Sequence, residues 1–240
     1  MDLLAYGAMA ERWRVVYSLH MNSGVSKARP FIREPFCGIS HLIGAVISVA
    51  GLVVLLVLAD GRPLCAVSFA LYGASLIALY TSSTLYHSLH VGSDLLQKID
   101  HCAIYCLIAG TYVPISLVGL GGPWGWVLFG LETAMAVFGV MITLLYQRQP
   151  AWVRVVLYIV MGWLALVAFG PLRAALPPAA IRGLVLGGLL YTTGAIVFAT
   201  DRPHLWPNRF SAHDLWHVFV LAGSAAHFWV ILEYLALGRS

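Results

Sequence analysis

The sequence has 240 residues, of which 60% are hydrophobic and only 10% are charged, and its mean hydropathy is +0.85. A soluble domain carries roughly 25% charged residues, so this composition excludes a soluble globular protein and predicts a multi-pass protein of the cell membrane. The net charge is +4. This small excess excludes a nucleic-acid-binding protein and makes the Lys and Arg residues signals of membrane topology.

The first 33 residues form the one long polar stretch. Aromatic residues such as Trp13 and Tyr17 alternate there with Arg12 and Arg14. A short helix lying on the membrane surface fits this pattern, and so does an irregular tail. We therefore predict two parts, a cytoplasmic N-terminal tail over 1–33 and a transmembrane domain over 34–240.

Seven apolar segments follow the tail, and each is close to the ~20 residues that cross a bilayer as a helix. Turn-forming residues separate them, for example at 60–63, 121–123, 147–150 and 177–178. The predicted fold is an all-α integral membrane protein, a bundle of seven transmembrane helices. The predicted spans are 36–59, 64–86, 102–120, 124–146, 152–171, 181–200 and 213–236.

The Lys and Arg residues are distributed unevenly between the two sides of such a bundle. One side holds ten of them: Arg12, Arg14, Lys27, Arg29, Arg33, Lys98, Arg148, Arg154, Arg202 and Arg209. The other side holds four: Arg62, Arg173, Arg182 and Arg239. Because basic loops stay in the cytoplasm, the N-terminus is predicted to be cytoplasmic and the C-terminus to lie outside.

The seventh span begins with two histidines at a metal-binding spacing. His213 and His217 are one helical turn apart, so they share a face and can bind one metal ion. A third ligand has to come from another helix, since His227 lies ~21 Å further along the same one. Alternatively, these histidines cap the helix entrance and form hydrogen bonds to their neighbours.

Alternating spans bring further polar residues to the same depth. Ser83 and His87 end the second span, Asp100 begins the third, and His213 and His217 begin the seventh. Ionisable groups within a bilayer are costly and usually mark a functional site. Three imidazoles predict a Zn²⁺ site with one position open for water, where Asp100 acts as a base or orients a histidine and Ser83 holds the water or an oxyanion. A hydrogen-bonded histidine belt is the alternative.

The cysteines show no disulfide pattern. All four lie in or beside apolar segments, as small buried residues do. Cys102 and Cys106 are one helical turn apart and are a weaker candidate for a metal pair.

Five motifs carry a family resemblance: EPFCGISH at 34–41, SSTLYH at 82–87, KID at 98–100, GTYVP at 110–114 and HDLWH at 213–217. In this order, and in register with seven spans, they resemble the bacterial hemolysin III proteins of the progestin and adipoQ receptor family, which includes the adiponectin receptors. The resemblance covers about 34–236 and implies a seven-helix bundle with a cytoplasmic N-terminus. It also implies a zinc ion ligated by His87, His213 and His217, with Ser83 and Asp100 near a zinc-bound water.

The resemblance further implies a role in membrane-lipid or membrane-energy homeostasis, and the adiponectin receptors themselves look like ceramide amidohydrolases. The long cytoplasmic domain of the animal receptors has no counterpart here, which argues against hormone signalling. We therefore expect a zinc-dependent hydrolase of a lipid amide or ester, with membrane lipids as partners and the lipid substrate in the bundle cavity. A non-catalytic regulator or receptor with a structural zinc, related to membrane energetics or cytolysis, is the alternative. A third possibility is an ion or proton path through His41, Glu132 and His227.

The predicted orientation can be tested by thiol labelling in intact cells. A cysteine replacing Ser23 should be shielded from a membrane-impermeant thiol reagent, whereas one replacing Ser240 should react, because the basic asymmetry places the two residues on opposite sides. The unmodified protein sets the background from the native cysteines. The reverse labelling pattern would overturn the orientation.

Overall fold

The computed structural model describes residues 32–146, 150–203, 205–206 and 210–239. Within these ranges the chain forms helices and no β-strand, apart from a single bridge between Trp206 and Phe210. Seven helices are long and apolar enough to cross a membrane, which confirms the predicted all-α, seven-span fold. Residues 1–31 of the predicted tail lie outside the described residues.

The first four membrane-spanning helices follow one another with short connections. They are α2 (Pro35–Leu58), α3 (Pro63–Ser88), α4 (Ser93–Pro114) with the π-helical segment η1 (Ile115–Leu120), and α5 (Gly122–Leu145). Pro at the first turn favours the start of α2 and α3, since its missing N–H leaves no helical bond unmade there. Pro114 removes a donor inside the third span, and the helix widens into η1 directly after it.

The fifth span differs from the uninterrupted helix predicted over 152–171. α6 (Ala151–Gly162) ends early, the 3₁₀ segment η2 (Leu164–Ala168) follows, and α7 (Phe169–Ala175) completes the crossing. The Tyr112 hydroxyl donates a hydrogen bond to the Gly162 carbonyl at 2.9 Å and accepts one from the Ala165 amide at 3.0 Å. The Tyr112 side chain of α4 thus supplies hydrogen bonds to two backbone groups at the break, which an apolar environment would otherwise leave unpaired.

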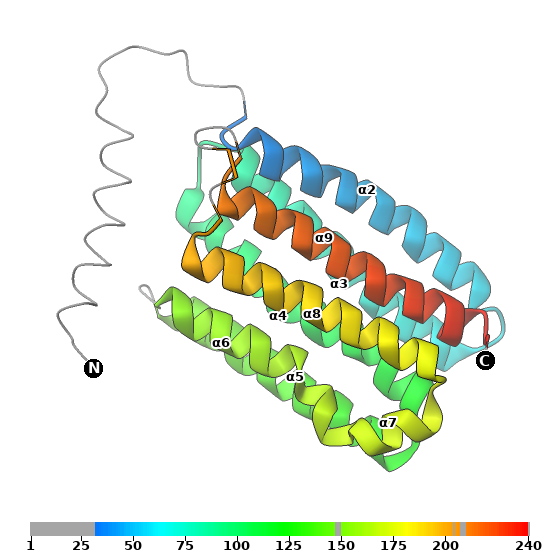
Figure 1. Cartoon of the computed structure of the whole chain (residues 1–240). Helices are drawn as coiled ribbons and strands as arrows, with labels where there is room; N and C mark the ends of the chain where they lie inside the picture. Colours follow the sequence, from blue (N-terminus) through cyan, green and yellow to red (C-terminus); the bar gives the residue numbers. More distant parts are fainter. Residues whose placement is uncertain (1–31, 147–149, 204, 207–209, 240) are drawn as a thin grey trace, which may run out of the picture. The chain divides into compact units, whose positions relative to one another are not determined.

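The last two spans are α8 (Pro178–Thr200) and α9 (Ala212–Val230), which continues as η3 (Ile231–Ala236). Contacts run from α2 through α3, α4, α5, α6 and α8 to α9, and α9 returns to α2. Figure 1 shows these helices side by side, with α9 between α2 and α8. Two glycines at a spacing of four, Gly183 and Gly187, let α8 approach Val230 and His227 of α9 closely.

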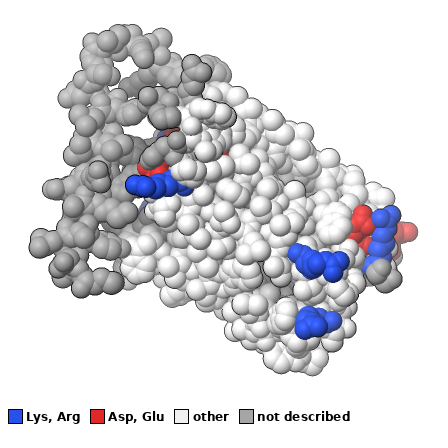
Figure 2. All heavy atoms as spheres, in the orientation of Figure 1, with Lys and Arg blue, Asp and Glu red and all other residues white. Residues whose placement is uncertain are grey.

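The surface of the bundle fits a bilayer. Many large apolar side chains point outward, for example Val46, Val57 and Leu145. In Figure 2 the charged side chains gather toward the two ends of the molecule, and the middle of the visible face carries almost none. An apolar band between two charged ends is what lipid contact requires.

The third span starts earlier than the apolar segment that predicts it. α4 begins at Ser93, nine residues before the predicted start at 102, because its polar first turns continue the helix beyond the apolar stretch. Asp100 therefore lies inside the helix, 8% exposed, rather than at its entrance. The helix thus holds the Asp100 carboxyl inside the bundle.

Candidate metal centre

The start of α9 is fixed by a capping box. The Ser211 hydroxyl accepts a hydrogen bond from the Asp214 amide at 3.1 Å, and Asp214 Oδ2 accepts one from the Ser211 amide at 2.7 Å. This reciprocal pair satisfies two amides that a helix start would leave unbonded. It begins the helix just before His213, which places His213 and His217 on its first two turns.

The start of α2 is attached to the end of α3. The amides of Arg33 and Glu34 donate to the carbonyls of Ser88 and His87 at 3.3 and 2.9 Å. The Glu34 side chain reaches the same histidine, with Oε2 at 2.5 Å from His87 Nδ1. Arg33 Nε lies 3.3 Å from the other oxygen of that carboxylate. Both backbone and side chain therefore hold Glu34 against His87.

Four donor side chains converge at this end of the bundle: Cys37 of α2, His87 of α3, and His213 and His217 of α9. One ligand atom of each lies within 4.8 Å of the others. The Nε2 atoms of His213 and His217 are 3.2 Å apart, and the His87 ring centre is 4.7 Å from that of His217. Cys37, His87 and His217 are 1–2% exposed. This buried group could hold a metal ion.

The donor set suits zinc. Tetrahedral zinc with bonds of about 2.0–2.3 Å holds its ligand atoms roughly 3.3–3.8 Å apart. The pair in α9 already has this separation, and shifts of about 1 Å close the widest gaps in the cluster. Because His87 Nδ1 faces Glu34, its Nε2 is left for the metal, and a carboxylate behind a histidine is the usual support for such a ligand.

The electrostatics of Glu34 agree with this role. Burial raises the pKa of the Glu34 carboxyl, but the hydrogen bond with His87 and the electrostatic interactions with His87, His213 and Arg33 outweigh it and hold the pKa below its ordinary value. An ionised Glu34 accepts a hydrogen bond from His87 Nδ1 and so fixes the orientation of the ring. The sequence did not predict the contact between Glu34 and His87, although Glu34 belongs to the EPFCGISH motif that carries the family resemblance.

The structure brings the predicted Ser83 and Asp100 together beside the three histidines. Ser83, one turn before His87 on α3, is 2% exposed, and its hydroxyl faces the Asp100 carboxyl of α4. Asp100 is close enough to His87 and Cys37 to interact electrostatically with both. All five predicted site residues therefore lie at one end of the bundle.

Cys37 is the member of the cluster that the sequence did not single out. Its place beside an apolar segment predicts a small buried residue there, and the metal alternative falls on Cys102 and Cys106 instead. Those two are partly buried and exposed, respectively, and are not part of the metal-compatible group found among the described residues. Membrane depth could have pointed to Cys37, because it lies at the start of its span, at the same end of the bundle as His87.

The three residues of the alternative ion path have separate surroundings. The His41 ring of α2 packs 4.0 Å from that of His217, beside the metal cluster. Glu132 of α5 is 1% exposed, and neither carboxyl oxygen has a hydrogen-bond partner among the described residues. His227 of α9 donates a hydrogen bond from Nδ1 to the Gly223 carbonyl at 2.9 Å, and its ring stacks on Tyr191. The Tyr191–His227 stack lies beside an apolar cavity.

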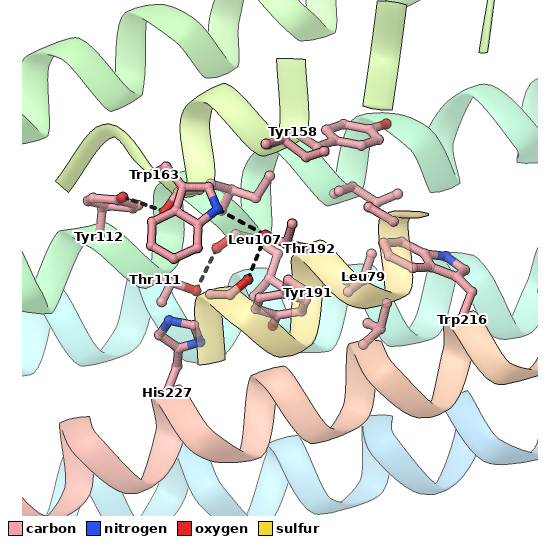
Figure 3. A pocket seen from close by; sticks show the side chains of 17 residues that line it. Leu79, Leu107, Thr111, Tyr112, Tyr158, Trp163, Tyr191, Thr192, Trp216 and His227 are labelled. Atoms are coloured by element: carbon pink, nitrogen blue, oxygen red, sulfur yellow. Dashed lines mark hydrogen bonds between the residues drawn. The ribbon is translucent and has the colours of Figure 1, made fainter. Parts of the chain in front are cut away.

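This cavity lies between α3, α4, α6, α8 and α9. Figure 3 shows Trp163, Tyr191, Trp216 and His227 around it. The Trp163 indole donates to the Thr192 hydroxyl at 2.9 Å, so one of the few polar groups on the wall is already satisfied. The remaining lining is mostly aliphatic and aromatic, and such a wall favours an apolar occupant.

Fold and site together define the class: a multi-pass seven-helix membrane protein with a buried histidine and cysteine centre. The chain belongs to the haemolysin-III-related family, whose family model matches residues 30–228. It is 38% identical over 219 residues to Hemolysin-3 of Bacillus cereus, covering 89% of this chain and 97% of the relative. It is 40% identical over 200 residues to the Hemolysin-3 homolog of Bacillus subtilis (strain 168), covering 82% and 91%.

A weaker similarity extends to adiponectin-receptor-like proteins. The monocyte to macrophage differentiation factor of Homo sapiens is 28% identical over 172 residues, 69% of either chain. These matches confirm the predicted family and, with the seven apolar helices, the predicted location as a multi-pass protein of the cell membrane.

The histidine ligands can be tested by metal analysis of purified protein. Replacing His87, His213 or His217 by alanine should remove most of the zinc, because the surrounding groups do not replace a lost ligand. His227→Ala, ten residues further along α9 than His217 and outside the cluster, is the matched control and should keep its zinc. Full zinc occupancy in His217→Ala would refute the assignment.

The support from Glu34 gives a second test. Glu34→Gln removes the charge behind His87 and should weaken zinc binding by about 10–100-fold, measured by competition with a chelator. Glu233→Gln is the control, since Glu233 pairs with Arg239 at 2.7 Å and lies at the other end of α9 and η3. Equal zinc affinities in the two variants would show that Glu34 does not support the ligand.

Proposed function

We propose that the protein is a zinc-dependent membrane hydrolase that cleaves an amide or ester bond of a lipid and contributes to membrane lipid homeostasis. The observation that carries the proposal is the placement of three convergent imidazoles directly beside the buried pair Ser83 and Asp100. His87, His213 and His217 would hold the zinc. A ceramide-like amide is the substrate class that the family resemblance suggests.

The chain supplies the other groups that hydrolysis needs. Bound zinc polarises a carbonyl and lowers the pKa of water to about 7. Asp100 is a buried carboxylate that interacts electrostatically with His87, and it is suited to accept a proton as general base. The Ser83 hydroxyl, which faces Asp100, can orient that carboxylate or donate a hydrogen bond to an oxyanion. Their burial excludes bulk water from the site.

The cavity supports a lipid substrate. Its wall includes Leu79, one turn before Ser83 on α3, and Trp216, the chain neighbour of His217. An acyl chain in this cavity would therefore extend away from the metal cluster toward the middle of the bundle. The carbonyl at the head of such a chain would lie near the zinc. This arrangement favours a lipid over a soluble peptide, since the cavity offers few polar partners.

The orientation of the site completes the proposal. In the orientation predicted from the basic asymmetry of the sequence, the end of the bundle at which α2 begins would lie in the cytoplasmic leaflet. The substrate would then reach the metal from the inner half of the bilayer.

A non-catalytic role is the second candidate, and one observation favours it. Cys37 offers a fourth protein donor to the same metal, and zinc with four protein ligands is typical of structural sites. In that case the ion would hold α2, α3 and α9 together in a regulator or receptor, without hydrolysis.

Asp100→Asn separates the two candidates. The hydrolase predicts that this variant keeps its fold and much of its zinc while turnover falls by about 10²-fold or more, because the general base is lost. Asp94→Asn, an exposed residue of the same helix, is the control. The measurement is fatty acid released from ceramides and phospholipids by the reconstituted proteins. Release that is equal in all variants, or absent from all, would contradict the hydrolase.

A further inference from the structure

The Cys37 thiol faces two different partners. Cys37 Sγ donates a hydrogen bond to Asp214 Oδ1 at 3.1 Å. The same sulfur lies within 4.8 Å of one ring nitrogen of each histidine in the cluster. The residue is 1% exposed, so neither partner is replaced by bulk water.

Asp214 is well placed to receive the thiol. Its Oδ2 is fixed by the amide and hydroxyl of Ser211 at 2.7 and 2.8 Å, which leaves Oδ1 for Cys37. Because the capping box holds this carboxylate, the thiol has a fixed acceptor on one side and the histidines on the other. His217 Nδ1, also buried, has no hydrogen-bond partner among the described residues.

We propose that Cys37 is a fourth ligand of the metal centre, one that can leave the metal for Asp214. The proposal rests on the proposed histidine metal centre and adds what regulates access to it. With the thiolate bound, the ion has four protein ligands and the centre is closed. With the thiol on Asp214, three histidines would remain on the metal and the centre would be open to substrate.

The ligand exchange is balanced without any redox step. On binding, the S–H bond of Cys37 breaks, a sulfur–metal bond forms, and the proton is released, as it is whenever a thiol binds a metal. On leaving, the sulfur–metal bond breaks, the sulfur takes up a proton, and the resulting S–H again donates a hydrogen bond to the Asp214 carboxylate. A shift of about 1 Å is enough for the sulfur to reach the ligand separations of a tetrahedral site.

The position of Cys37 distinguishes it from the other cysteines. Cys65 is buried at the start of α3, at the opposite end of that helix from His87. It is therefore a matched control, since it is a buried cysteine of the same chain without a place in the metal cluster.

Cobalt substitution gives a direct readout of sulfur ligation. Co²⁺ occupies zinc sites and shows a sulfur-to-cobalt charge-transfer absorption in the near ultraviolet only when a thiolate binds it. Full-length protein in detergent, stripped of metal and loaded with one equivalent of Co²⁺, should show this band. Cys37→Ala should lose the band and still retain cobalt on its histidines, whereas Cys65→Ala should keep both.

The outcomes separate this inference from the proposed function. Suppose that the unmodified protein binds cobalt without a charge-transfer band, and that His217→Ala no longer binds it. This result would overturn the role of Cys37 but would support the histidine centre. A band that persists in Cys37→Ala would also overturn it. No cobalt binding at all would refute both. Because the unmodified protein gives the decisive spectrum, the test does not depend on the folding of a variant.

Discussion

A polar side chain buried in a membrane bundle is costly without a polar partner, because lipid and apolar side chains offer none. At the end of the bundle where α2 begins, this constraint is met between helices. The hydrogen bond between Glu34 and His87 joins the start of α2 to the end of α3. The hydrogen bond from the Cys37 thiol to Asp214 joins α2 to the start of α9. Three helix termini are therefore held together by the same groups that surround the candidate metal.

This arrangement links the local helix signals to the chemistry. The capping box of α9 fixes where the helix starts and, through that, the direction in which His213 and His217 point. One turn deeper, the polar groups give way to the apolar wall of the cavity. Leu79 and Trp216, which line the cavity, lie one turn from Ser83 and next to His217 in the chain. Under the proposed function, this proximity suits a molecule with one polar head and a long apolar chain.

Much of this could be predicted from the sequence because it depends on strong, local patterns. Hydropathy and helical length predicted the seven spans, and alternating topology brought Ser83, His87 and Asp100 to the depth of the α9 histidines. The break of α6 at Gly162 carries no proline and depends on Tyr112 of another helix, so local reasoning missed it. Cys37 was missed for a similar reason, since its partners are distant in the chain and only the fold brings them near.

The central claim is that three histidines hold a zinc ion at this end of the bundle. X-ray absorption at the zinc edge of the purified, unsubstituted protein tests it most directly. We predict about one zinc per chain, with imidazole nitrogens at about 2.0–2.1 Å from the metal. Protein that contains no zinc, or zinc surrounded by oxygen ligands alone, would contradict it.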